Sequence, residues 1–279
     1  MTTALSPAIH YGLSYEEYVA LPGIRSSQIP GPRAALAKMR HAELHPSETA
    51  AMRLGIAVHA AILEPSVYAA RYVACERSTG AGSRAANAAR KAAIAAAGVL
   101  ELDDEERAAV EGMRAAVIEH VEAASLIAGA LACELTVTWT DDISGAPCKA
   151  RLDVVRERAI VDLKTCGDGL AEEDAWRGHA MRYGYHRQAA WYLSGAAAVD
   201  PGGADRRWKW IVVESAAPYV VEVHEADDEL LEIGLEECRA GLARRLEAER
   251  TGVWPGYPRR AKTIRPPAWM RSRPDVDAK

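Results

Sequence analysis

Residues 148–165 predict a charged β-hairpin, and this segment sets the architecture expected for the rest of the chain. Polar and apolar residues alternate over 149–155, and residues 159–164 are rich in Ile, Val and Leu, so each segment is expected to be a strand. Residues 156–159 form the connecting turn. An antiparallel register across this turn places three pairs opposite each other: Val155 and Ile160, Asp153 and Asp162, Arg151 and Lys164.

The expected register brings two carboxylates together. Directly opposed side chains in a sheet have Cβ atoms roughly 4.5–5.5 Å apart, so Asp153 and Asp162 would repel each other unless a cation lay between them. Lys164 follows Asp162 by two residues and emerges on the same face. Two acids beside an ammonium suit a hard divalent cation. The alternative is an ordinary surface hairpin in which Asp153 pairs with Arg151 or Lys164.

Composition narrows the class of protein. The chain has 279 residues, of which 49% are apolar, so it can bury a core. It contains no run long enough to cross a membrane and no secretory leader, which predicts a cytoplasmic protein without a membrane partner. The five cysteines form no CxxC pair and suggest neither a zinc knuckle nor an iron–sulfur cluster. The net charge of −5 argues against indiscriminate coating of nucleic acid.

The N-terminal part of the chain is expected to be mostly helical. Residues 48–63 predict a buried helix that ends near Pro65, with Gly55 one turn before His59. The imidazole of His59 is either a hydrogen-bonded core group or a metal ligand. Residues 78–98 predict a glycine-containing loop and a helix with solvated cations. Residues 103–130 predict one long helix with an apolar stripe formed by Val110, Met113, Val117 and Val121.

A strand is expected over residues 133–140, just before the hairpin. Glu134 lies at its start and could supply a third acid to a metal site; otherwise it faces solvent. Further strands are expected over 207–214 and 218–224, and an amphipathic helix over 227–250. The proline-rich tail from Trp254 carries six cations and either binds phosphates or is solvated.

A helix from about Glu172 to Gly195 mixes cations with aromatic residues. That mixture suits contacts to phosphates and stacking on bases; the alternative is aromatic core packing with exposed arginines. Gln188 and Tyr192 lie one turn apart on one face. The candidate DNA contacts are Arg151 on the hairpin and Arg182, Tyr185, His186, Arg187, Gln188 and Tyr192 on this helix.

Four segments in this order resemble the PD-(D/E)xK nuclease superfamily in its RecB/RecE-like branch, and most closely the nuclease domain of phage-type exonuclease VIII. The segments are residues 55–59, 148–153, 160–165 and 183–192. The resemblance implies an α/β fold with a mixed central sheet flanked by helices. We expect a single nuclease domain with N-terminal helical additions over about 1–130, a core over about 131–251 and a basic tail over about 252–279.

The resemblance also implies roles for the residues in these segments. His59, Asp153, Asp162 and the backbone carbonyl of Leu163 would hold the metal, with Glu134 as the least secure ligand. Lys164 would orient or activate the attacking water, and Gln188 and Tyr192 match a Q-x3-Y element near the scissile strand. The implied cofactor is Mg²⁺, and a histidine among oxygen ligands favours tolerance of Mn²⁺.

The implied activity is Mg²⁺-dependent digestion of linear duplex DNA, from 5′ to 3′, which leaves 3′ single strands for strand-annealing recombination in a bacterial or phage-infected cell. The implied partners are DNA, further copies of the chain in a trimeric or tetrameric ring, and a single-strand annealing recombinase. Two alternatives stay open: a structure-specific or single-strand endonuclease on the same fold, and a catalytically inactive DNA-binding subunit.

Overall fold

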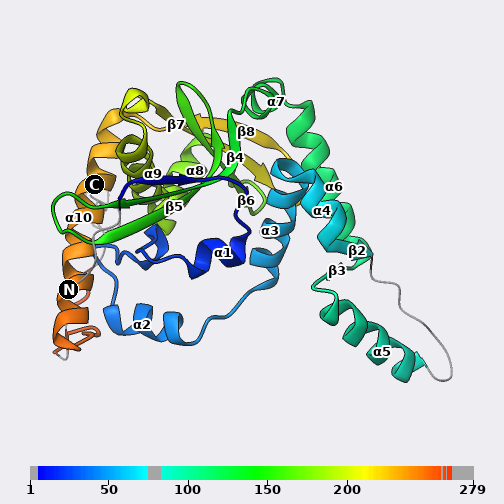
Figure 1. Cartoon of the computed structure of the whole chain (residues 1–279), viewed down its shortest axis with the longest axis horizontal. Coiled ribbons are helices and arrows are strands. Elements are labelled where there is room, and N and C mark those ends of the chain that lie inside the picture. Colours follow the sequence, from blue (N-terminus) through cyan, green and yellow to red (C-terminus); the bar gives the residue numbers. More distant parts are fainter. Residues whose placement is uncertain (1–5, 75–82, 259, 262, 266–279) are drawn as a thin grey trace, which may run out of the picture.

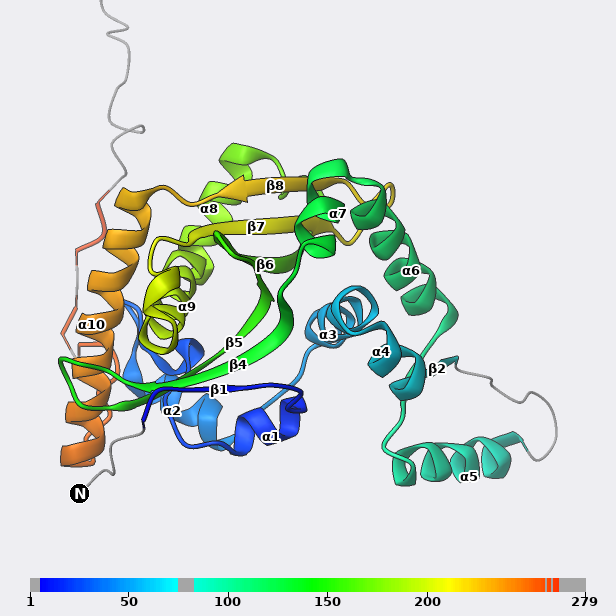
Figure 2. The same ribbon diagram turned by 45° about the horizontal axis from the view of Figure 1, so that its top comes forward.

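The computed structural model describes residues 6–74, 83–258, 260–261 and 263–265. Its centre is a six-stranded sheet (Figures 1 and 2) with the strand order β1-β4-β5-β6-β7-β8. The strands are β1 (Ala8–His10), β4 (Ala132–Thr140), β5 (Pro147–Val155), β6 (Ala159–Cys166), β7 (Arg207–Glu214) and β8 (Val221–Glu225). All neighbours are antiparallel except β6 and β7, which are parallel. The expected mixed sheet is therefore confirmed.

The predicted register of the hairpin is confirmed next to the turn, but the pairing of β5 with β6 ends after two residue pairs. Val155 pairs with Ile160 and Val154 with Val161, as the four-residue connection predicts. No further β5–β6 pair forms, so the expected ladder pairs Asp153–Asp162 and Arg151–Lys164 are wrong. Arg151 lies opposite Thr136 of β4 instead. Beyond Val154, β5 stays with β4 and β6 stays with β7, and the two pairs of strands separate.

Helices cover both faces of the sheet (Figure 2). On one face lie α8 (Glu173–Tyr183), α9 (Tyr185–Val199) and α10 (Asp228–Thr251), over a core that includes Leu152, Ile160, Trp176, Trp191, Trp208 and Leu242. On the other lie α3 (Ala50–Leu63), α6 (Asp104–Glu119) and α7 (Val121–Ala128), over a core that includes Val58, Met113, Val117, Val161, Leu163 and Ile211. Gly234 of α10 allows close packing on α9, because a Cβ there would lie 2.4 Å from the His186 carbonyl oxygen.

Two expected long helices are each broken in two. The helix expected over 103–130 is interrupted at His120, which ends α6 and caps α7 through its ring nitrogen. The break turns Val121 outward, so the prediction that it belongs to the core is wrong: it is 85% exposed. The helix expected over 172–195 is interrupted at Gly184, whose φ of +75° is the left-handed conformation that glycine adopts readily.

The remaining elements lie in the N-terminal half, apart from one 3₁₀ turn between α9 and β7. They are α1 (Tyr15–Ala20), α2 (Leu36–Leu44), α4 (Pro65–Arg71), α5 (Ser83–Ala96), the 3₁₀ turns at Ser26–Gln28 and Pro201–Gly203, and a small parallel pair of strands, β2 (Tyr72–Ala74) and β3 (Leu100–Leu102). Figures 1 and 2 show α5 standing away from the main body beside this small pair. Its cations Arg84 and Lys91 are exposed, whereas Arg90 pairs with Glu101.

Some expectations fall outside the described residues. Gly80 and Gly82 of the expected loop do so, as does most of the basic tail. The first part of the tail is described, and there Trp254 packs against the guanidinium groups of Arg40 and Arg245. Across the described ranges, none of the helices combines the length and apolar character needed to span a bilayer.

The N-terminal arm is tied to β5 by a buried lysine. Helix α1 begins with a capping box formed by Ser14 and Glu17. Beyond it, the ammonium of Lys149 donates to the carbonyl oxygens of Tyr18 at 3.0 Å, Val19 at 2.9 Å and Leu21 at 2.6 Å. Lys149 is 4% exposed, and burial lowers its pKa. The ammonium thus satisfies carbonyls that the end of α1 leaves unpaired.

Replacing Lys149 with Met is expected to lower the free energy of unfolding by about 2–4 kcal/mol, because it removes the donor for three carbonyl oxygens. Urea denaturation would measure the change. Lys38→Met is the matched control, since Lys38 is exposed and lies over the Tyr257 ring, and it should alter stability by less than about 0.5 kcal/mol. Equal effects of the two substitutions would contradict the anchoring role of Lys149.

Candidate active site

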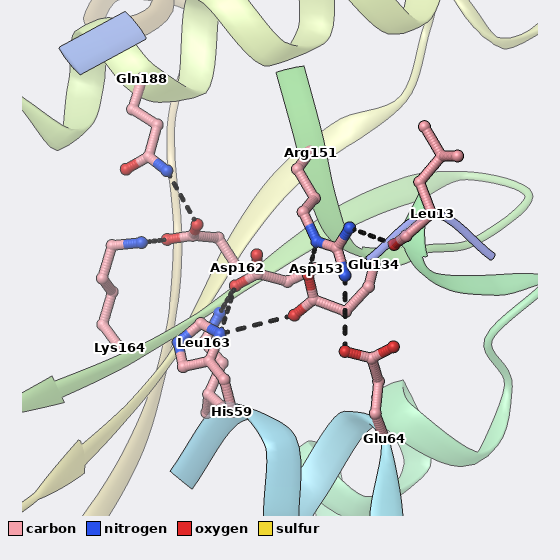
Figure 3. A network of polar contacts seen from close by, with 10 residues as sticks. All are labelled: Leu13, His59, Glu64, Glu134, Arg151, Asp153, Asp162, Leu163, Lys164 and Gln188. Atoms are coloured by element: carbon pink, nitrogen blue, oxygen red, sulfur yellow. Dashed lines mark hydrogen bonds and ion pairs between the residues drawn. The ribbon is translucent and has the colours of Figure 1, made fainter. Parts of the chain in front are cut away.

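Three side chains from three elements converge beside the point where β5 and β6 separate (Figure 3). They are His59 from α3, Glu134 from β4 and Asp153 from β5. The Nδ1 atom of His59 lies 3.6 Å from Oδ2 of Asp153 and 3.8 Å from Oε1 of Glu134. Among the described residues, these three form a group that could hold a metal ion, because one ligand atom from each lies within 4.8 Å of the other two.

Glu134 and Asp153 lie opposite each other at a point where the regular alternation of side chains along β4 and β5 is interrupted. The pairs on either side, Cys133 with Val154 and Leu135 with Leu152, place the two acids opposite each other. Leu135 and Leu152 pack into the core beneath α9, whereas Cys133 and Val154 pack into the core beneath α3. Both strands therefore change face at the same step. Glu134 has a φ of +51°, an uncommon conformation for a non-glycine residue and one that often marks a functional site.

The cluster fits a divalent cation. Ligand atoms bound to one ion at about 2.1 Å lie at most about 4.2 Å from each other, and both His59 distances meet this limit. Two carboxylates and one imidazole form a donor set that can bind Mg²⁺ and is better suited to Mn²⁺. His59 is partly open to solvent, with 27% of its side chain exposed, so an ion could reach it.

Asp162 and Lys164 of β6 lie next to this cluster. The Lys164 ammonium forms an ion pair with Oδ2 of Asp162, and the side-chain amide of Gln188 donates to Oδ1 at 3.2 Å. The backbone N–H of Leu163 donates to Oδ2 of Asp153 at 2.8 Å and joins the two halves of the site. Both oxygens of Asp162 therefore face protein donors, and metal ligation by Asp162 or by the Leu163 carbonyl stays a prediction.

The pKa values of the site residues are shifted because several acids lie close together in a buried site. Burial raises the pKa of Asp153 to about 7, although His59 and Lys164 oppose this shift. Burial by itself lowers the pKa of His59, but the carboxylates of Asp153 and Glu134 outweigh it and raise the pKa to about 9. Burial also lowers the pKa of Lys164, but Asp162 and Asp153 outweigh burial, so the pKa is raised. The carboxylates of Asp153 and Glu134 thus stabilise a positive charge at the position of His59, as a cation site does.

Arg151, expected to contact DNA, instead binds groups within the protein. Its guanidinium donates to Oε2 of Glu134 at 2.5 Å and to the Leu13 carbonyl oxygen at 2.6 Å, and it lies 3.5 Å from Oε2 of Glu64. Only 10% of the side chain is exposed. These partners occupy the donors that a phosphate would need, so the expected DNA contact does not fit this geometry. Arg151 instead holds Glu134 toward His59.

Replacing Arg151 with Met is expected to weaken Mn²⁺ binding roughly 10- to 100-fold, because Glu134 loses the group that orients it. It should also lower the free energy of unfolding by about 3 kcal/mol, since a buried carboxylate loses its partner. Calorimetric titration and urea denaturation measure the two effects. Arg177→Met is the control: Arg177 is 61% exposed and pairs with Glu173 and Asp174 of its own helix. Unchanged metal affinity in Arg151→Met would rule out the orienting role.

The remaining expected site residues lie on α8 and α9 and divide into two groups. His186 and Tyr192 are buried, and His186 bonds to Glu237 at 3.1 Å, which also accepts from Arg187 at 3.2 Å. Arg182 is exposed, and the ring of Tyr185 lies 5.0 Å from the Lys164 ammonium. Arg182 and Tyr185 are thus placed where DNA could contact them, whereas a contact by His186 or Tyr192 would need the surface to open.

Sequence reasoning missed Glu64 and Leu13, which support Arg151. Glu64 precedes Pro65, and this pattern indicated only the end of a helix. Leu13 contributes a backbone carbonyl, for which the sequence holds no signal. Gly55 packs against β6, where a Cβ would lie 3.3 Å from Oγ1 of Thr165. It lets α3 approach the sheet closely enough for His59 to reach the carboxylates.

The fold and the sequence were compared with those of known proteins. The structure resembles the crystal structure of a provisionally assigned exonuclease from Eubacterium rectale, with a TM-score of 0.61 and 14% sequence identity, over 96% of this chain and 100% of that one. At this identity the likeness shows a common fold. No curated protein matches the chain in sequence. Residues 26–267 match the family described as a PDDEXK-like domain of unknown function (DUF3799), and the chain therefore belongs to that PDDEXK-like family.

Proposed function

We propose that the protein is a metal-dependent deoxyribonuclease, and specifically a Mg²⁺-dependent exonuclease that accepts Mn²⁺. One observation carries the proposal: His59, Glu134 and Asp153 form a cluster that fits a divalent cation, and the Asp162–Lys164 ion pair lies directly beside it. The PDDEXK-like family and the fold shared with a provisionally assigned exonuclease support the same activity.

The residues of the site have complementary roles in phosphodiester hydrolysis. A divalent cation held by His59, Glu134 and Asp153 would lower the pKa of a water molecule and offset negative charge on the phosphate. Lys164, held by Asp162, would supply a fixed positive charge close to the attacking hydroxide and the reacting phosphate. Gln188 keeps Asp162 in position through its amide. Tyr192 is buried and interacts with the Gln188 side chain, which it would help to hold in place.

The finer features of the proposal rest on the resemblance to RecE-like nucleases. They are digestion of linear duplex DNA from 5′ to 3′, release of 3′ single strands for strand annealing, and assembly into a trimeric or tetrameric ring that works with an annealing recombinase in the cytoplasm. Exposed Arg182 and partly exposed Tyr185 beside Lys164 are compatible with a strand that enters along the ends of α8 and α9.

The decisive experiment is a time course on linear duplex DNA labelled at one 5′ or one 3′ end, beside a covalently closed circle of the same sequence. We expect mononucleotides or short products from the linear DNA in Mg²⁺ or Mn²⁺, an intact circle, and no products in EDTA. Early release of the 5′ label would support the proposed polarity.

The other outcomes identify the alternatives. Cleavage of the duplex circle, or of a single-stranded circle tested beside it, would indicate an endonuclease on this fold. Mn²⁺ binding without any cleavage would indicate an inactive DNA-binding subunit. Cleavage that persists in EDTA would overturn the metal-dependent mechanism.

A further inference from the structure

A block of four aromatic rings joins the candidate active site to the surface. Trp176 stacks on His179 and on Tyr185, with ring centroids 5.6 and 5.5 Å apart. Tyr183 completes the block, with its centroid 4.5 Å from His179 and 6.1 Å from Tyr185. The block is anchored at one end, because Trp176 is 3% exposed and packs on Trp210 and His224.

The other end of the block is open. Tyr183 is 58% exposed, although it belongs to an otherwise well-packed group of rings. It is the last residue of α8, and Tyr185 is the first of α9. The left-handed Gly184 between them turns the chain so that the two rings lie nearly parallel, at 22°. The break between the two helices therefore leaves the Tyr183 ring exposed to solvent while it packs against His179 and Tyr185.

This aromatic face adjoins the proposed chemistry. The Tyr185 ring lies 5.0 Å from the Lys164 ammonium, which in turn pairs with Asp162. Tyr183 is the next ring outward. A phosphate that reaches Lys164 would thus place a neighbouring nucleotide of the same strand within reach of Tyr183. Exposed Arg182, the adjacent residue, adds positive charge for the strand's backbone.

We propose that Tyr183 is a stacking platform for the base next to the scissile phosphate, and that the site therefore takes a base whose face is uncovered. This inference rests on the proposed function, in which DNA is the substrate. A base inside a continuous duplex is covered on both faces by its neighbours, whereas a strand's last base or an unpaired base is not. The aromatic platform thus favours strand ends and frayed or single-stranded segments. Base–aromatic stacking tolerates any sequence, as a digesting enzyme requires.

The test measures whether the effect of removing a DNA base on binding depends on the Tyr183 ring. Dissociation constants are measured in EDTA, so that no metal-dependent cleavage occurs, for DNA ends that carry either a normal nucleotide or an abasic one at each of the last few positions. For the native protein, we expect removal of the stacked base to weaken binding about 5- to 150-fold at one position. For Tyr183→Ala, the normal end should bind as weakly as the abasic end, with no further loss on base removal.

Two control variants make the result specific. Tyr183→Phe keeps the ring and should retain the full coupling. Tyr257→Ala removes a tyrosine of similar exposure, 64%, that lies over Lys38 away from the aromatic block, and it should behave as the native protein does. Photocross-linking from a 5-iodouracil at the coupled position should label Tyr183 in the native protein.

The results separate this inference from the nuclease proposal. Equal coupling in the native protein and in Tyr183→Ala, or no effect of base removal at any position, would overturn the stacking platform even if the protein cuts DNA. Coupling that is lost in Tyr183→Ala would support the platform even if the time course on labelled DNA shows no cleavage, and the proposed chemistry alone would then be contradicted.

Discussion

Replacing Lys164 with Gln is expected to reduce the single-turnover rate of DNA cleavage by about 10³-fold or more. The ammonium pairs with Asp162 in a site where only 14% of the lysine side chain is exposed, so its charge is weakly screened. A fixed charge in such a site stabilises the charge that develops on the phosphate, and loss of one such group typically reduces rates 10²- to 10³-fold. Loss of its part in positioning the attacking water reduces the rate further.

Glutamine is chosen because its amide can still donate a hydrogen bond to Asp162, which is 1% exposed and would otherwise lose its partner at Oδ2. Thermal unfolding should therefore change by only a few degrees, and DNA binding in EDTA by less than about tenfold. Single-turnover rates on an end-labelled duplex provide the measurement. A variant that retains more than a tenth of the native rate would remove Lys164 from the proposed mechanism.

Replacing Asp153 with Asn is expected to abolish both Mn²⁺ binding and cleavage without destabilising the apo protein. The amide oxygen can still accept the hydrogen bond from the Leu163 N–H. The substitution removes a carboxylate whose pKa burial raises to about 7. A raised pKa means that the ionised form opposes folding, so this destabilisation is complete above pH 7 and diminishes as the pH falls from 7 toward about 4, the pKa of an unfolded aspartate.

At pH 8 the Asp153→Asn variant should therefore have a Tm equal to or above the native value, while calorimetry with Mn²⁺ shows no binding heat. This combination separates loss of a ligand from damage to the fold. Asp168→Asn, at an exposed position in the loop after β6, is the matched control and should leave metal binding and Tm unchanged. Native-like Mn²⁺ affinity in Asp153→Asn would exclude this carboxylate as a ligand.

The hairpin and the sheet class could be predicted from the sequence because they depend on local patterns. Alternation of polar and apolar residues, together with a short polar connection, determined the pairing of Val155 with Ile160. The same reasoning failed two residues further on. Pairing beyond Val154 depends on how β4 and β7 hold the two strands, and these contacts are distant in sequence.

Glu134 shows what a strand pattern cannot reveal. Its left-handed backbone conformation has no local cause, since glutamate is not a residue that favours positive φ. The conformation is stabilised by tertiary contacts with Arg151 and His59, which come from a neighbouring strand and a distant helix. Pattern reasoning therefore placed the acid on the expected strand but could not decide whether it faced solvent or the site.

The breaks in the helices were partly visible in the sequence. Gly184 lies inside a helical pattern, and glycine there is a recognised signal for a helix end. The interruption at His120 had no such signal, because the ring cap that it provides depends on the chain already having turned. The apolar stripe of α6 was confirmed at Val110, Met113 and Val117, where it packs against the sheet.

The first two dozen residues contain none of the proposed metal ligands or catalytic groups, yet the carbonyl oxygen of Leu13 holds the arginine that positions Glu134. The anchoring carbonyls around Leu21 hold the same arm to β5 through Lys149. Detaching this arm, by truncation or by a bulky fusion at the start of the chain, would therefore impair the catalytic centre from a distance. Loss of activity in a protein shortened at this end would therefore reflect the lost support of Arg151 by Leu13, and activity assays should use a protein that keeps these residues.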